Sequence, residues 1–93
     1  MKIRVTEDDI ILGRRNSCRR CPVARAGQRA TAGLVTVSII NIDGLYLFRR
    51  RPSALGATMR DTPLPPDAAK FVHDFDEGLD VSPFEFDLTF EED

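Results

Sequence analysis

The chain has few of the residues on which common functional sites depend, and each shortage bears on a class of function. Its 93 residues hold two cysteines and one histidine. Because a structural zinc site takes about four ligands, these residues would need a carboxylate, water or a second copy to complete one. His73, which we expect to be exposed, has no obvious Ser or Cys partner. We therefore expect a protein that is not an enzyme and uses no cofactor.

Long apolar runs are also missing. No run approaches the ~20 residues that span a bilayer, and no internal repeat or low-complexity tract is visible. The start, MKIRVTEDD, turns acidic where a signal peptide would be apolar. With 42% hydrophobic and 30% charged residues, the composition is typical of a globular chain. We expect one domain over residues 1–93, located in the cytoplasm without membrane contact.

Lysine is scarce, since eleven of the thirteen basic residues are arginine. Arginine binds carboxylates and phosphates through paired hydrogen bonds, so this bias favours specific anion recognition. Residues 1–51 carry a charge balance of +7 and residues 52–93 one of −9. We expect the two halves to neutralise each other in so small a fold, with an anion-binding surface as the alternative. Binding to duplex nucleic acid is not expected, because such proteins are usually basic overall.

The strongest structural signal is a β-hairpin over residues 34–51. Two runs rich in β-branched and aromatic residues flank Asp43-Gly44, a dipeptide typical of a two-residue turn because both positions take φ > 0. This turn would set Ile42 opposite Leu45 and Ser38 opposite Arg49. A two-stranded ribbon is not stable alone, so other elements must cover it.

Hydrophobic periodicity predicts the remaining elements. Gly27 in the middle of a helix favours close packing of that helix against the hairpin. The order β-α-α-β-β-α-β predicts a two-layer α+β domain, with a mostly antiparallel four-stranded sheet and helices on one face. We expect strands at residues 2–6 and 84–90, helices from Pro22 to about Ala32 and from Pro66 to Gly78, and a loop from Pro52 to Pro66. A further short helix is expected between Thr6 and Gly13, with Thr6 as its N-cap, Asp9 three residues later as in a capping box, and Gly13 as the C-terminal glycine.

Cys18 and Cys21 form a C-x-x-C pair just before the helix that begins at Pro22. The helix dipole and nearby arginines would lower the pKa of the thiols, as a redox dithiol requires. The same pair would supply two ligands of a zinc site. We expect structural cysteines instead, because the βαβ unit that frames thioredoxin-like motifs is missing.

The same segment is also a candidate anion site. A helix N-terminus offers free N–H groups, and guanidinium groups beside it would pair with phosphate or carboxylate. The sequence thus predicts an arginine-rich contact surface near this helix, and its expected residues are Arg14, Arg15, Arg19, Arg20, Arg25, Arg29, Arg49, Arg50 and Arg51.

Acidic residues gather where the helix dipole disfavours them. Asp74, Asp76 and Glu77 crowd the last turn of the third helix. We expect residues 49–51 to compensate them. A metal site that also includes Asp80 is the alternative, although no calcium-loop spacing is present.

The last strand carries a second set of acids. Glu85 and Asp87 alternate with apolar residues and would face water. They are expected to lie opposite either residues 2 and 4 or residues 49 and 51, because opposite charges stabilise cross-strand pairs.

Four short motifs cover both ends of the chain. They are Gly13-Arg14, Cys21-Pro22-Val23-Ala24-x-Ala26, Phe75-Asp76-x-Gly78 and Val81-x-Pro83-Phe84-x-Phe86. Together they resemble a group of small uncharacterised proteins encoded by tailed bacteriophages and prophages. This resemblance implies a viral accessory protein that binds a host protein or a signalling nucleotide, for example in anti-defence. It implies no catalytic mechanism.

The sequence and the resemblance together predict a non-enzymatic, phage-type accessory protein in the host cytoplasm. It would act by stoichiometric binding of a host protein or a phosphate-bearing nucleotide through the arginine-rich face. One alternative is a small dithiol redox or zinc-binding protein that uses Cys18 and Cys21. Another is a structural virion-assembly protein, for which we would expect a homo-oligomer held by apolar surface.

Overall fold

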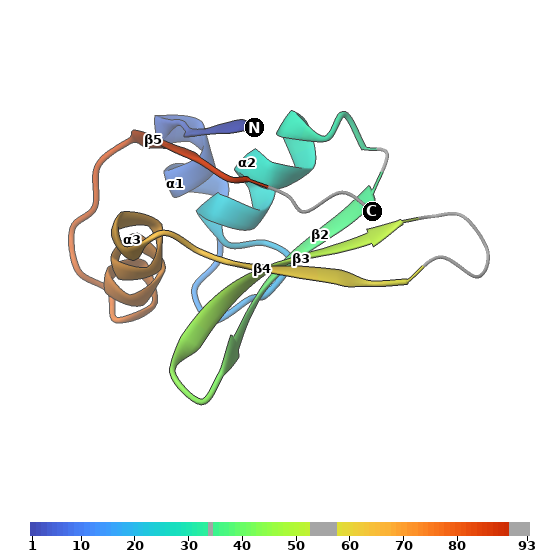
Figure 1. The fold of residues 1–93 in the computed structure, drawn as a ribbon. Coiled ribbons are helices and arrows are strands. Elements are labelled where there is room, and N and C mark those ends of the chain that lie inside the picture. Colours follow the sequence, from blue (N-terminus) through green and yellow to red (C-terminus); the bar gives the residue numbers. More distant parts are fainter. Residues whose placement is uncertain (34, 53–57, 90–93) are drawn as a thin grey trace.

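The computed structural model describes residues 1–33, 35–52 and 58–89 and gives an α+β domain (Figure 1). The described residues form two antiparallel sheets, one with the order β1-β5 and the other with the order β2-β3-β4. The elements are β1 (Lys2–Val5), α1 (Glu7–Leu12), α2 (Pro22–Ala30), β2 (Val35–Ile42), β3 (Leu45–Pro52), β4 (Arg60–Pro63), α3 (Pro66–Asp76) and β5 (Phe84–Asp87).

The β2-β3 hairpin is confirmed in every cross-strand pair. Ile42 lies opposite Leu45, and Ser38 lies opposite Arg49. Both turn residues have positive φ, 52° at Asp43 and 86° at Gly44. The Asp-Gly turn therefore sets the register of the whole hairpin, because a two-residue loop is too short to allow one strand to shift relative to the other.

The predicted loop from Pro52 to Pro66 is wrong in its second half, while residues 53–57 lie outside the described part. Residues 60–63 form β4, which pairs with β3 and adds a third strand. The four residues Arg-Asp-Thr-Pro carry little strand propensity. Their pairing is supported by an ion pair across the strands, in which Arg49 donates to Asp61 from Nε at 2.8 Å and from Nη2 at 2.9 Å.

The single four-stranded sheet is also wrong, because β1 pairs only with β5 among the described strands. Helix α2 contacts both β1 and β2, so the N-terminal strand packs on this helix and does not join the hairpin. Of the two predicted partners for Glu85, the first is confirmed: Glu85 lies opposite Arg4, whose Nε donates to Oε1 at 2.8 Å. Phe90 of the predicted strand lies outside the described residues.

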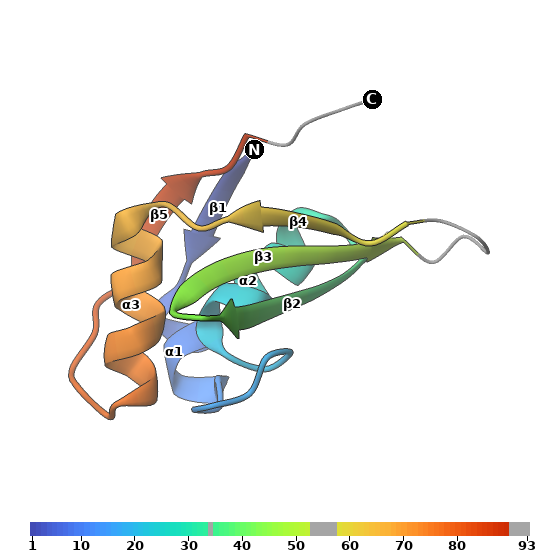
Figure 2. The same ribbon diagram turned by 60° about the horizontal axis from the view of Figure 1, so that its bottom comes forward.

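Helix α2 packs closely against the hairpin, as its small residues predict. A Cβ on Gly27 would lie 2.5 Å from Cε2 of Phe48 and 3.0 Å from Cγ1 of Val37. Phe48 and Val37 are buried on the same face of the sheet, and Figure 2 shows α2 behind the three strands. The helix ends at Ala30, two residues before the predicted end.

The other helix boundaries follow local signals. Thr6 caps α1 through a capping box with Asp9, as predicted. Gly78 follows α3 with a φ of 79°, the predicted C-terminal glycine. Gly13 ends α1 for a different reason, since its φ is −69° and a Cβ there would lie 2.8 Å from the ring of Pro22. No helix within residues 1–33, 35–52 and 58–89 is long and apolar enough to cross a membrane.

Candidate functional site

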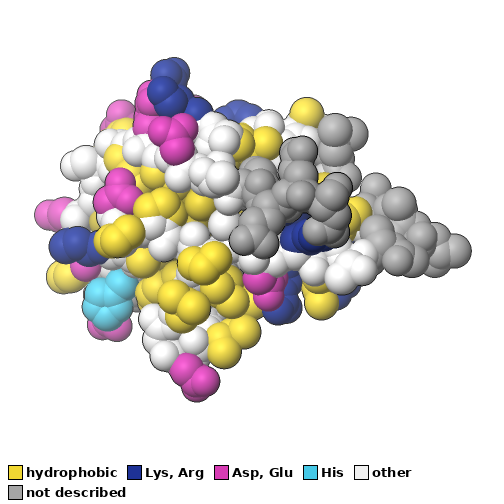
Figure 3. Space-filling model, viewed as in Figure 1, with side chains coloured by type: hydrophobic (Ala, Val, Ile, Leu, Met, Phe, Trp, Pro, Cys, Tyr) yellow, Lys and Arg dark blue, Asp and Glu magenta, His cyan; other side chains and the backbone are white. Residues whose placement is uncertain are grey.

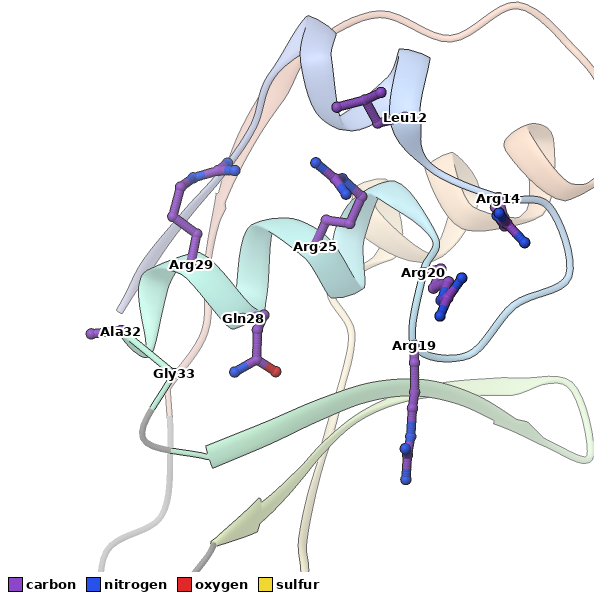
Figure 4. A pocket seen from close by; sticks show the side chains of 9 residues that line it. All are labelled: Leu12, Arg14, Arg19, Arg20, Arg25, Gln28, Arg29, Ala32 and Gly33. Carbon is purple, nitrogen blue, oxygen red and sulfur yellow. The ribbon is translucent and has the colours of Figure 1, made fainter.

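Five of the predicted arginines meet in one groove along α2. Figure 4 shows Arg25 and Arg29 rising from one side of α2, with Arg14, Arg19 and Arg20 on the segment before its N-terminal end. The groove has a volume of about 860 Å³. We call it the arginine groove, and its lining residues are Leu12, Arg14, Arg19, Arg20, Arg25, Gln28, Arg29, Ala32 and Gly33.

Backbone hydrogen bonds hold the segment that carries the first three arginines. The N–H of Arg14 donates to the carbonyl of Arg20 at 2.8 Å, which closes the segment into a loop. Inside it, the N–H of Arg20 donates to Oγ of Ser17 at 3.2 Å. The N–H of Ile39 donates to the carbonyl of Cys18 at 2.7 Å, which joins the loop to β2. The loop is thus anchored to both α2 and the sheet, and its exposed arginine side chains project from a fixed backbone.

Asp9 neutralises the α2 side of the groove from within the protein. Its side chain is fully buried and accepts two hydrogen bonds from Arg29, at 2.9 Å on Oδ1 and 2.7 Å on Oδ2. The Nε atom of Arg25 lies 3.6 Å from Oδ1. Arg29 also donates to the carbonyl of Arg4 at 2.8 Å. These contacts tie α1, α2 and β1 together around one carboxylate.

The charge of Asp9 is maintained in this buried position. Burial by itself would raise the pKa of the carboxyl group, but the hydrogen bonds from Arg29 and from the N–H of Thr6 outweigh it, and the pKa lies below its usual value of 3.8. The sequence singled out Asp9 only as a capping residue. Two arginines one turn apart on the next helix could have indicated an ion pair with Asp9. The sequence does not show, however, that the two helices pack together at these residues.

The loop side of the groove is different. Among the described residues, no acidic side chain forms an ion pair or hydrogen bond with the side chains of Arg14, Arg19 or Arg20. All three residues are exposed. These guanidinium groups therefore keep their hydrogen-bonding capacity for an anionic partner.

Four predicted site residues lie outside the groove. The guanidinium of Arg15 lies beside Gly78, where a Cβ would be 3.2 Å from its Cζ, at the C-terminal end of α3. Arg49 pairs with Asp61, and Arg51 donates to Sδ of Met59 at 3.3 Å. Arg50 alternates with these two along β3 and is half-buried. The basic run at residues 49–51 therefore does not extend the arginine groove.

The N-terminus of α2 is not an open anion site. Cys21 is buried and caps the helix, with Sγ accepting from the N–H of Ala24 at 3.4 Å. Residues 21–24 are all buried. Burial raises the pKa of the Cys21 thiol to about 11, opposite to the lowered value that a redox dithiol would need. Cys18 is exposed, and both cysteines are free.

Two of the acids at the end of α3, Asp74 and Asp76, have partners other than the predicted arginines. Lys70 forms an ion pair with Asp74, and the backbone N–H of Asn16 donates to Oδ1 of Asp76 at 2.9 Å. His73 is exposed, as expected. In the part of the chain that the structure describes, no three acidic, histidine or cysteine side chains are placed to hold a metal ion.

The two oppositely charged halves of the chain meet only in part. Arg4 with Glu85, and Arg49 with Asp61, are pairs between the halves. The arginine groove is instead built entirely from residues of the basic half.

No protein-family model, curated protein or solved structure matches the chain. The resemblance to phage proteins therefore stays a prediction, and the groove is interpreted from its own residues.

Proposed function

We propose that the chain is a non-enzymatic, phage-type accessory protein that binds an acidic surface of a host protein through the arginine groove. The observation that carries this proposal is the set of three exposed guanidinium groups, on Arg14, Arg19 and Arg20, that have no acidic partner among the described residues. Their loop is held by backbone hydrogen bonds at both ends. A loop whose backbone is already held in place loses less conformational entropy on binding than a mobile loop.

The lining of the groove favours a protein surface over a nucleotide. Among the described residues that line the groove, none has an aromatic side chain on which a base would stack. It does contain Leu12, which is 60% exposed, and the neighbouring Ile11 is 68% exposed. Arginine beside aliphatic surface is a combination that protein interfaces use, because the guanidinium pairs with carboxylates while the apolar side chain is buried on contact.

Two probes distinguish the possible anions. A fluorescently labelled peptide of alternating Glu and Leu represents an acidic protein surface, and ATP represents a phosphate-bearing nucleotide. We expect the peptide to bind one-to-one and to weaken as salt is raised, because exposed charge pairs are screened. Replacing Arg19 and Arg20 together by Ala should weaken peptide binding by at least ~10-fold, the equivalent of ~1.4 kcal/mol.

Arg15 supplies a matched control, since it belongs to the same sequence cluster but lies outside the groove. The Arg15→Ala variant should bind the peptide as the unmodified protein does. Equal losses in Arg15→Ala and in the double variant would indicate diffuse attraction by net charge and would contradict the proposal. If ATP binds more tightly than the peptide and the double variant no longer binds ATP, the ligand of the groove would be a nucleotide instead of a protein.

A further inference from the structure

A second surface, on the outer face of the β2-β3-β4 sheet, is apolar at one end. The register places Ile42 beside Leu45 and, in the next row, Ile40 beside Leu47 and Pro63. Helix α2 packs on the opposite face of this sheet. Ile42 and Leu45 are 49% and 51% exposed. Figure 3 shows hydrophobic side chains gathered low on the molecule, where Figure 1 places the hairpin end of β2 and β3.

The edges of this sheet are poorly suited to pairing with another strand. On the β2 edge, the side-chain amide of Gln28 donates to the carbonyl of Val35 at 2.6 Å and accepts from the N–H of Val37 at 3.0 Å. The N–H of Ile39 is taken by the carbonyl of Cys18. On the other edge, β4 has four residues and includes Pro63, which has no N–H to donate. Association through this sheet would therefore use its outer face rather than its edges.

The charges on the outer face fit a second copy of the same face. Asp43 stands at the turn, next to the row of Ile42 and Leu45. Arg49 and Arg51 lie two and three rows further along the same face of β3. Arg49 is already paired with Asp61 of β4 on this face, so Arg51 is the cation of the two without an acidic partner among the described residues. Consider a two-fold axis that lies in the plane between two copies and runs across the strands at the apolar rows. Such an axis would place the apolar rows of one copy against the apolar rows of the other. It would also bring Asp43 of each copy near the arginines of the other.

We propose that the protein forms a symmetric dimer through the outer face of the β2-β3-β4 sheet, with the apolar rows at its centre. A two-fold interface uses the same patch on both copies, so a patch that carries its own complementary charges is suited to it. Two strands of eight residues and one of four, ~4.8 Å apart with a rise of ~3.4 Å per residue, make a face smaller than roughly 14 by 27 Å. Such a small face favours a weak, concentration-dependent dimer over an obligate one.

Sedimentation of the full chain from about 1 µM to about 1 mM tests this proposal. We expect the mass to rise from monomer toward dimer across this range. Leu45→Glu should weaken dimerisation by at least ~10-fold, because it buries a carboxylate at the centre of the interface. The matched control is Leu79→Glu, since Leu79 is a similarly exposed leucine (58%) outside this face; it should dimerise normally.

Asp43→Asn removes the charge and keeps a turn residue that accepts positive φ. It should weaken the dimer several-fold at low salt, with the same melting temperature as the unmodified protein. A protein that stays monomeric to about 1 mM overturns the proposal, as does a Leu45→Glu variant that dimerises normally. Loss of the dimer in the Arg19→Ala, Arg20→Ala double variant would also overturn it and would identify the arginine groove as the interface.

Discussion

The two sides of the arginine groove use the same residue type in different ways. Arg25 and Arg29 on α2 converge on the fully buried carboxylate of Asp9. Arg14 and Arg20 on the loop have no acidic partner among the described residues. The comparison shows that the position of Asp9 determines the role of each arginine. The two beside it stabilise the fold, and those on the loop are available to a partner.

The energetic consequence follows from burial. An ion pair on the surface contributes little, because water solvates both charges when the pair is broken. A buried carboxylate that loses its cation has no such alternative and destabilises the protein strongly. Removing an arginine from the α2 side and removing one from the loop side should therefore have very different effects on stability.

The largest expected difference is between Arg29→Ala and Arg20→Ala. Arg29→Ala leaves the buried Asp9 carboxylate without its two hydrogen bonds from a guanidinium, while Arg25 stays 3.6 Å away. Because the side chain of Arg29 is itself 52% exposed, we expect a loss of about 2–4 kcal/mol in the free energy of unfolding, below the full value for a buried pair. Arg20→Ala should stay within about 0.5 kcal/mol of the unmodified protein. Urea unfolding measures both values. Equal losses of unfolding free energy in the two variants would contradict the distinction between a structural side and an available side of the groove.

A smaller effect is expected from acid. Because the folded-state pKa of Asp9 lies below its usual value of 3.8, its ionisation stabilises the fold above that value, and this contribution is lost as pH falls through the folded-state pKa. Asp9→Asn should cost about 1.5–3 kcal/mol at pH 7, and the difference from the unmodified protein should shrink as the pH falls. Unfolding curves from pH 7 downward check this. A difference that stays constant with pH would show that Asp9 acts through shape rather than charge.

The smallest effect concerns the cysteines, which flank the junction of the loop and α2. Cys18 is exposed, whereas Cys21 is buried with its pKa raised to about 11. Iodoacetamide at pH 8 should modify Cys18 in the folded protein and leave Cys21 unmodified until the protein unfolds. Mass spectrometry of the labelled peptides distinguishes the two. Faster labelling of Cys21 than of Cys18 would support the redox alternative.

Local sequence signals were sufficient for most elements. The Asp43-Gly44 turn determined the hairpin register, and the Thr6 capping box and Pro22 placed the starts of α1 and α2. The close approach at Gly27 was predictable because glycine is otherwise unfavourable inside a helix. The turn and the helix starts depend on residues near one another in the chain, and the Gly27 contact could be predicted because the glycine itself marks the site of close packing.

Several features that join distant segments were missed, although the pairing of Arg4 with Glu85 was predicted. Strand β4 has little propensity of its own and depends on its pairing with β3, including the ion pair of Arg49 with Asp61. The clamp between Asp9 and Arg29 spans twenty residues and depends on how α1 packs against α2. The sequence predicted a cluster of arginines around α2, but their division into a structural pair and an available set required the fold.

The most direct measurement is a map of amide chemical-shift changes in the ¹⁵N-labelled protein as the Glu-Leu peptide is added. The central claim predicts that the largest changes fall on residues 14–20 and on the arginine side of α2, while the amides of β3 and β4 stay in place. Changes centred on residues 40–47 instead, or spread evenly over all basic residues including Arg49 and Arg51, would contradict it.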